Sequence, residues 1–163
     1  MIAEGKNTLM KIGGNTDVVT CFCQCYKQFC NQPMDIVSEL KGCSREQACE
    51  AVYGYMCSNV QYLIDPDGDQ YIKSPARLLS DGYGDCKSLT MFVASCLHCL
   101  GIPCIVRFVN FDGGSQFTHV YPVALLEDGR EMPLDMCELS EDGTPYIDYA
   151  REYKNKKDIY YGK

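Results

Sequence analysis

The residues best suited to chemistry lie in one short segment, Gly82-Tyr-Gly-Asp-Cys-Lys-Ser88. Its two glycines permit a tight turn, and Asp85 is predicted to cap a helix that begins at Cys86. At the first turn of a helix, unpaired backbone N–H groups and the positive end of the helix dipole favour a thiolate and can bind an oxyanion. A buried structural cysteine has no need of this position, so Cys86 is the candidate nucleophile.

A cysteine nucleophile needs a base, and the chain contains 2 histidines. His98 follows Cys86 along the same predicted helix and would lie about 18 Å away, at a rise of about 1.5 Å per residue. That distance excludes His98 as the partner of Cys86. A single histidine in a strand more often has a structural role, but elimination and the motif upstream make His119 the candidate base.

Asp135 is the candidate group that orients His119, because a catalytic base needs a partner on its far nitrogen. It lies one predicted hairpin away from His119. With a tight turn centred between Asp128 and Gly129, the two residues would be about three positions out of direct register. A bulge at a strand proline could close this gap. The alternative, in which Asp135 is a strand-end carboxylate without a catalytic role, stays open.

The elements that must position these residues follow from apolar periodicity and from capping and turn residues. Predicted helices run from Asp17 to a stop at Pro33, over the short piece Met34–Leu40, from Ser44 (with Gln47 at the capping-box position) to a stop at Pro66, and from Asp85 to Gly101. Predicted strands cover 104–111, 117–126 and 131–137. Helices followed by a run of antiparallel strands indicate an α+β fold.

The 163 residues correspond to one domain, without an internal repeat. Residues 1–15 are weakly patterned and predict a loose N-terminal arm. Residues 16–149 form the predicted domain, and residues 150–163 carry several lysines and predict a solvated basic tail.

Charge and composition exclude several classes of protein. The net charge of −7 opposes a nucleic-acid surface, which needs clustered basic residues. No stretch approaches the roughly 18 apolar residues of a membrane span, and the N-terminus lacks the apolar segment of a signal peptide. The 12 cysteines fall mainly at apolar positions of periodic segments. We therefore expect reduced thiols and a cytoplasmic protein rather than a disulfide framework.

Two segments resemble metal sites only weakly. Cys96 and Cys99 flank His98 in a C-x-x-C pattern, but a second ligand pair at zinc-finger spacing is lacking. The loop Asp65-Pro-Asp-Gly-Asp69 has spaced carboxylates, yet Gln70 and Ala76 stand where a calcium loop wants Gly and Glu. An acidic turn is the preferred interpretation, and we expect neither a metal nor a cofactor.

From about residue 59 to residue 137 the chain resembles the transglutaminase-like superfamily. The segment Gly84-Asp-Cys-Lys-Ser88 resembles the nucleophile motif of that family, Thr118-His-Val120 its histidine motif, and Leu134-Asp135 its aspartate motif. The order of the three motifs also agrees. The resemblance implies a papain-like, transglutaminase-like core, with N-terminal helices packed on an antiparallel sheet.

The resemblance also implies an activity: hydrolysis of an amide or peptide bond through a Cys86 thioester, with His119 moving the proton and Asp135 holding the imidazole. The chain has no tryptophan, so the oxyanion-hole tryptophan of some family members is absent. The oxyanion-hole candidates are the Cys86 backbone N–H and the side chains of Asn59, Tyr62 and Tyr71.

Three alternatives accompany hydrolysis of a peptide or protein substrate. An amine acceptor would make the protein a transglutaminase, although the small chain shows no calcium site or second-substrate module. A catalytically silent member would act as a binding or assembly module within a larger complex, such as a phage or mobile-element component. The third alternative is a zinc-binding protein.

Overall fold

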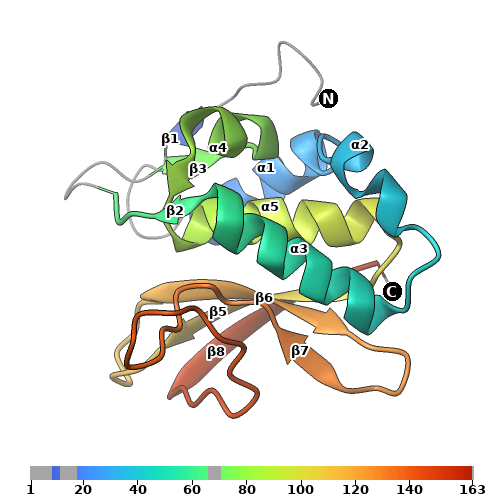
Figure 1. Cartoon of the computed structure of the whole chain (residues 1–163). Helices are drawn as coiled ribbons and strands as arrows, with labels where there is room; N and C mark the ends of the chain where they lie inside the picture. Colours follow the sequence, from blue (N-terminus) through green and yellow to red (C-terminus); the bar gives the residue numbers. More distant parts are fainter. Residues whose placement is uncertain (1–8, 12–17, 66–70, 163) are drawn as a thin grey trace.

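The computed structural model describes residues 9–11, 18–65 and 71–162, and it confirms the α+β architecture. A layer of helices covers one face of a four-stranded antiparallel sheet with strand order β7-β6-β5-β8 (Figure 1). The sheet strands are β5 (Cys104–Asn110), β6 (His119–Leu125), β7 (Glu131–Pro133) and β8 (Asn155–Tyr161). Within the described residues, no helix is both long and apolar enough to cross a membrane.

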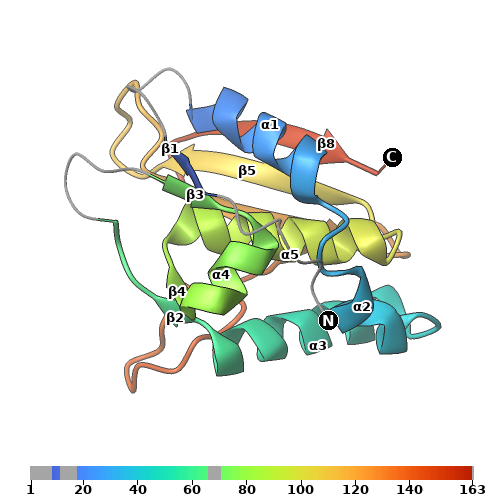
Figure 2. The ribbon, with the colours of Figure 1, turned by 90° about the horizontal axis from the view of Figure 1, so that it is seen from above.

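The helix that begins at Cys86 is the centre of the helical layer. This helix, α5 (Cys86–Cys99), packs on β6 and is buried from Lys87 to Leu97. Seen from above, it runs between α1 (Val18–Phe29) and α3 (Arg45–Asn59), and both helices pack against it (Figure 2). The apolar residues of α1, α3 and α5 and one face of the sheet share a single core. Because α5 is buried from Lys87 to Leu97, the position of Cys86 at its N-terminal end is fixed.

The predicted helix boundaries are largely confirmed. The Asp85 carboxylate caps α5 by accepting hydrogen bonds from the backbone N–H groups of Lys87 and Ser88, and Gly101 ends the helix with a φ of 70°. Ser44 and Gln47 form the predicted capping box of α3. The short segment after Pro33 forms α2 (Met34–Val37) and the 3₁₀ turn η1 (Ser38–Leu40).

The predicted stop of α3 at Pro66 is wrong, because the helix ends at Asn59. The next residues form β2 (Gln61–Tyr62), which pairs in parallel with β4 (Tyr83–Gly84) just before Cys86. Between these strands lie β3 (Tyr71–Lys73) and α4 (Pro75–Asp81), which the sequence analysis did not predict. The parallel pairing brings Tyr62 to the nucleophile segment.

Both chain ends depart from the predicted loose segments. Residues Leu9–Lys11 form β1, which pairs with β3, while the rest of the predicted N-terminal arm lies outside the described residues. The predicted solvated tail is wrong for β8, which is an edge strand paired along the whole length of β5. Ile159 and Tyr161 of β8 pack against the main core.

The register of the β6–β7 hairpin differs from the predicted one by a single residue. Val123 pairs with Pro133 instead of Leu134, because the loop has three residues and ends on Gly129 at a φ of 85°. In the continued register, Asp135 lies diagonally across from His119 on the same side of the hairpin. No bulge is needed to bring them together.

Gly84 has a structural role that leads to a prediction. A Cβ at Gly84 would lie 2.6 Å from Cδ1 of Leu78 and 3.1 Å from Cβ of Ser88. We expect Gly84→Ala to lower the free energy of unfolding, measured by urea denaturation, by about 1–3 kcal/mol. The matched control is Gly54→Ala, where a Cβ meets nothing within 4 Å and alanine should stabilise α3. Equal stabilities for the two variants would contradict this packing argument.

Candidate active site

Cys86 is the first residue of α5 and is half-buried. The cap formed by Asp85 engages the N–H groups of Lys87 and Ser88 at 3.0 and 3.4 Å. Of the first-turn amides, the Cys86 N–H is therefore the one that remains the candidate oxyanion donor. The side chain of Asp85 is itself held by an ion pair with buried Lys87, so the nucleophile segment is tied down by local contacts.

His119, at the start of β6, lies between Asp135 and Cys86. Its Nε2 lies 2.6 Å from Oδ2 of Asp135, and Cys86 is close enough to raise the pKa of its imidazole. Because Nε2 faces Asp135, Nδ1 is the nitrogen that remains for Cys86. Burial lowers the pKa of His119, but the hydrogen bond to Asp135 and the proximity of Cys86 outweigh burial and raise it from 6.5 to about 9.

Asp135 is buried with only 6% of its surface exposed, and it is held from three sides. Besides His119, the Cys137 backbone N–H donates to Oδ1 at 3.0 Å, and Arg151 Nη1 donates to Oδ2 at 2.9 Å. Burial raises the pKa of Asp135, but His119, the Cys137 amide and Arg151 together lower it below its ordinary value. The carboxylate is thus ionised and fixed in orientation.

Arg151 is a site residue that the sequence analysis assigned to the tail and missed. Its guanidinium also forms an ion pair with Glu138, and it lies 5.0 Å from the ring centre of Phe111 and 5.5 Å from that of Tyr121. No local sequence pattern marks this residue, because its contacts depend on the chain folding back before β8.

Removal of Arg151 should destabilise the protein. We expect Arg151→Ala to lower the free energy of unfolding by about 1.5–3 kcal/mol at neutral pH, because Asp135 loses a charge-assisted hydrogen bond. Asp135 should also protonate at a higher pH, so the acid-induced loss of stability should begin at a higher pH. Urea denaturation across the acid range measures both effects. The control is Arg130→Ala, whose exposed ion pairs should contribute little to stability; an equally small effect of Arg151→Ala would contradict the role of Arg151.

The structure separates the three side chains considered for the oxyanion hole. Half-buried Tyr62 pairs through β2 with Gly84 of β4, and burial, followed by nearby Cys137, Cys86 and Asp85, raises its pKa. Asn59 instead donates its amide to the Tyr55 carbonyl at 2.8 Å. Tyr71 lies in β3. Of the three, only Tyr62 is placed beside the nucleophile by a described contact.

The predicted alternative zinc ligands do not form a cluster among the described residues. His98 Nε2 lies 3.2 Å from Oδ1 of Asn31, and the Cys99 thiol donates to the Cys30 carbonyl at 3.3 Å. Cys96 is fully buried in the core, as are Cys25 and Cys104, which the sequence analysis also placed on apolar faces. Packing and local hydrogen bonds account for these residues.

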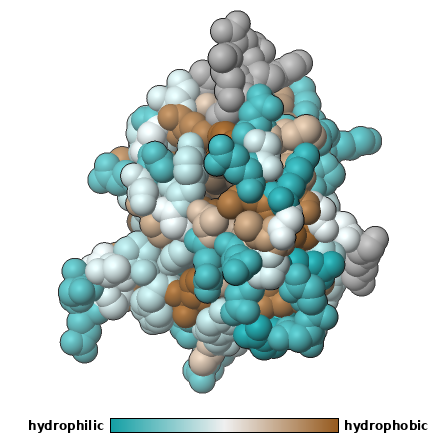
Figure 3. Space-filling view, turned by 45° about the vertical axis from the view of Figure 1, so that its right-hand side comes forward, coloured by the Kyte–Doolittle hydropathy of each residue, from teal (hydrophilic) through white to brown (hydrophobic). Residues whose placement is uncertain are grey.

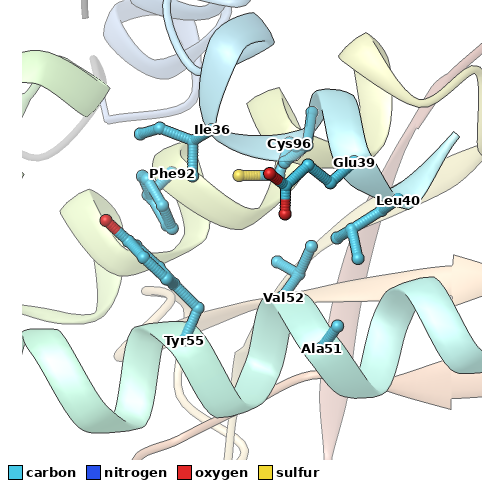
Figure 4. A pocket seen from close by; sticks show the side chains of 9 residues that line it. Ile36, Glu39, Leu40, Ala51, Val52, Tyr55, Phe92 and Cys96 are labelled. Carbon is cyan, nitrogen blue, oxygen red and sulfur yellow. The ribbon is translucent and has the colours of Figure 1, made fainter. Parts of the chain in front are cut away.

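A separate apolar cavity of about 220 Å³ lies between η1, α3 and α5 (Figure 4). Tyr55 and Phe92 stack at one side of it, with Leu40 and Val52 on the other and the Glu39 carboxylate directed inward. Phe92 is six residues along α5 from Cys86, about 9 Å of helix rise. The face that carries α2 and α3 also shows scattered apolar patches between hydrophilic residues (Figure 3). None of the cavity residues is a member of the candidate active site.

Comparison with known sequences agrees with this geometry. Residues 35–136 match the transglutaminase-like superfamily, and the chain therefore belongs to that family. The match starts within α2, so it extends further toward the N-terminus than the resemblance seen in the motifs. No curated protein gives a significant match to the chain.

Solved structures share the fold at low sequence identity. A protein from Parabacteroides distasonis described as a candidate protease aligns at a TM-score of 0.60 and 13% identity, over 72% of this chain and 26% of the other. Calcium-bound LapG of Legionella pneumophila aligns at 0.52 and 18%, over 80% of each chain. A candidate cysteine protease from Cytophaga hutchinsonii aligns at 0.51 and 15%, over 90% of this chain and 54% of the other. The chain thus spans about a quarter of the first of these proteins.

Proposed function

We propose that the protein hydrolyses an amide or peptide bond by thiol catalysis, with Cys86 as nucleophile, His119 as base and Asp135 as orienting group. The observation that carries the proposal is the position of His119, which hydrogen-bonds with Asp135 and lies close enough to Cys86 for that thiol to raise the His119 pKa. Membership of the transglutaminase-like superfamily and a fold shared with candidate cysteine proteases support it.

The proposed reaction begins with transfer of the Cys86 proton to Nδ1 of His119. The Cys86 sulfur then attacks the amide carbonyl, and the oxyanion is stabilised by the Cys86 backbone N–H, with Tyr62 as the candidate second donor. His119 returns the proton to the leaving amine, which leaves a thioester on Cys86. Water, activated by the same imidazole, releases the acid product and the free thiol.

Asp135 keeps this imidazole in the productive orientation and stabilises its charged form. Because the pKa of His119 is raised to about 9, the imidazolium that pairs with a thiolate is the populated form at neutral pH. This arrangement suits a papain-like reaction, in which the ion pair exists before the substrate binds.

The acceptor of the acyl group decides between a peptidase and a transglutaminase. We suggest incubating the protein with a library of glutamine-containing peptides, with and without a primary amine, and analysing the products by mass spectrometry beside Cys86→Ala. Hydrolysis gives a free acid and acyl transfer gives an amine conjugate, and both must depend on Cys86. If the wild-type protein forms neither product nor a thioester, the proposal fails and a silent binding module becomes the better account.

A further inference from the structure

We infer that His119, Asp135 and Cys137 form a zinc-binding site, and that zinc bound there stops the reaction at Cys86. One ligand atom from each of these residues lies within 4.8 Å of the other two. Imidazole nitrogen, carboxylate oxygen and thiolate sulfur are the ligands that zinc takes in proteins. The argument for zinc binding depends on this cluster alone, whereas the effect of zinc on the reaction at Cys86 rests on the proposed function.

The backbone holds the cluster in place before any ion arrives. The Cys137 N–H donates to Oδ1 of Asp135, so the thiol and the carboxylate are fixed relative to each other. Oδ2 of Asp135 already faces Nε2 of His119 at 2.6 Å. The Cys137 sulfur lies within 4.8 Å of a ring nitrogen of His119 and of a carboxylate oxygen of Asp135. An ion would therefore need little rearrangement to replace the proton between His119 and Asp135.

The charges around the cluster suit a divalent cation. Binding releases two protons to solvent, one from the Cys137 thiol and one from the His119 imidazolium. The two positive charges of zinc and the one on Arg151 are then balanced by the Cys137 thiolate and the carboxylates of Asp135 and Glu138. Arg151 already pairs with Glu138 as well as with Asp135, so its guanidinium keeps a partner when Asp135 binds the ion.

Zinc on Nε2 would remove the acid that serves the leaving amine, without touching the nucleophile. A neutral imidazole that binds a metal through Nε2 carries its proton on Nδ1. This neutral imidazole is a far weaker acid than the imidazolium, so His119 could not give its Nδ1 proton to the leaving amine, and no thioester would form on Cys86. Zinc would thus act as a reversible inhibitor that competes with the proton shared by His119 and Asp135.

The test is a zinc titration of the full-length, chelator-treated chain, carried out on Cys86→Ala so that binding is measured without turnover. We expect one zinc ion per chain, and Cys137→Ser in this background should weaken the affinity by about 10-fold or more. With cobalt as the probe, the sulfur-to-metal charge-transfer absorption should disappear in the same variant. The matched control is Cys99→Ser, which removes a half-buried thiol outside the cluster and should change neither readout.

Unchanged zinc affinity in Cys137→Ser would overturn the proposal, as would loss of binding in Cys99→Ser, which would place the ion at the C-x-x-C segment. If circular dichroism shows that Cys137→Ser is misfolded, Asp135→Asn replaces it, and unchanged affinity there overturns the site equally. An active wild-type protein that binds no zinc refutes this inference and leaves the proposed function intact. Zinc binding by a chain without hydrolytic activity would refute the proposed function instead.

Discussion

Replacement of Cys86 by alanine should reduce turnover to background, because no other described residue takes the position of the sulfur at the N-terminus of α5. His119→Ala should be nearly as damaging, with a loss of about 10²–10⁴-fold, since it removes both the base and the acid for the leaving amine. Asp135→Asn keeps the size of the side chain and should have the smallest effect of the three. Its turnover should be about one to two orders of magnitude higher than that of Cys86→Ala. Steady-state kinetics on a peptide substrate give this ranking.

A double variant that combines Cys86→Ala with His119→Ala tests whether these residues act as one unit. If the three residues act as one unit, adding His119→Ala to Cys86→Ala should cost nothing further, because losses within a catalytic unit are not additive. Cys99→Ser, on the same helix but outside the site, is the matched control and should retain full turnover. Turnover by Cys86→Ala at the wild-type rate would remove Cys86 from the reaction, and a harmless His119→Ala would assign the base to another group.

The second large effect is on the reactivity of Cys86 toward an alkylating agent. His119→Ala should slow alkylation of Cys86 at neutral pH by about 10-fold or more, because an opposite charge at about 4 Å contributes roughly 1–4 kcal/mol near a protein surface. The helix dipole, which both proteins keep, contributes only about 0.3–1 kcal/mol. Rates measured by quantitative peptide mapping across a pH series test this, with exposed Cys43 as the internal reference thiol. Equal Cys86 rates in both proteins would show that His119 is not its partner.

The raised pKa of His119 predicts how the stability of the fold changes with pH. The pKa of His119 in the folded protein, about 9, lies above its ordinary value of 6.5. Its interactions therefore stabilise the fold fully below about pH 6.5, and this stabilisation is lost as the pH rises through about 9. Asp135→Asn removes the hydrogen bond and charge that raise the His119 pKa, so the loss should move to lower pH in that variant.

Local signals explain why the sequence predicted the starts of α3 and α5 well. The Asp85 cap and the Ser44–Gln47 capping box each involve residues at most three positions apart, and their hydrogen bonds form in the structure as predicted. Caps of this kind depend on unpaired amides at helix ends, which every helix has. Their positions could therefore be read without knowledge of the tertiary fold.

The side of the hairpin on which Asp135 lies relative to His119 depends on whether the loop has two or three residues. A loop of two residues and a loop of three residues both fit a glycine after Asp128, and the two differ by one position in register. Only in the observed register do His119 and Asp135 share a side of the hairpin. The sequence identified both residues correctly as neighbours but gave the wrong register.

Contacts between distant segments account for what the sequence did not show. The lysine-rich end was taken for a tail because its charges suggest solvent, but lysine is common on edge strands, where it discourages pairing with other chains. Lys156 and Lys157 of β8 are both exposed, while Ile159 packs against the main core. Arg151 reaches the site only through this folding of the C-terminal segment, so no spacing rule could have selected it.

The most direct test of the central claim is to treat the native protein with a limiting amount of iodoacetamide at about pH 6, followed by peptide mapping of all cysteines. We predict that label concentrates on Cys86. Burial raises the pKa of most core thiols, for example to about 12 for Cys25, Cys49 and Cys104, so these should not compete. Label spread over the exposed thiols, with none preferred at Cys86, would contradict an activated thiolate and with it the proposed reaction.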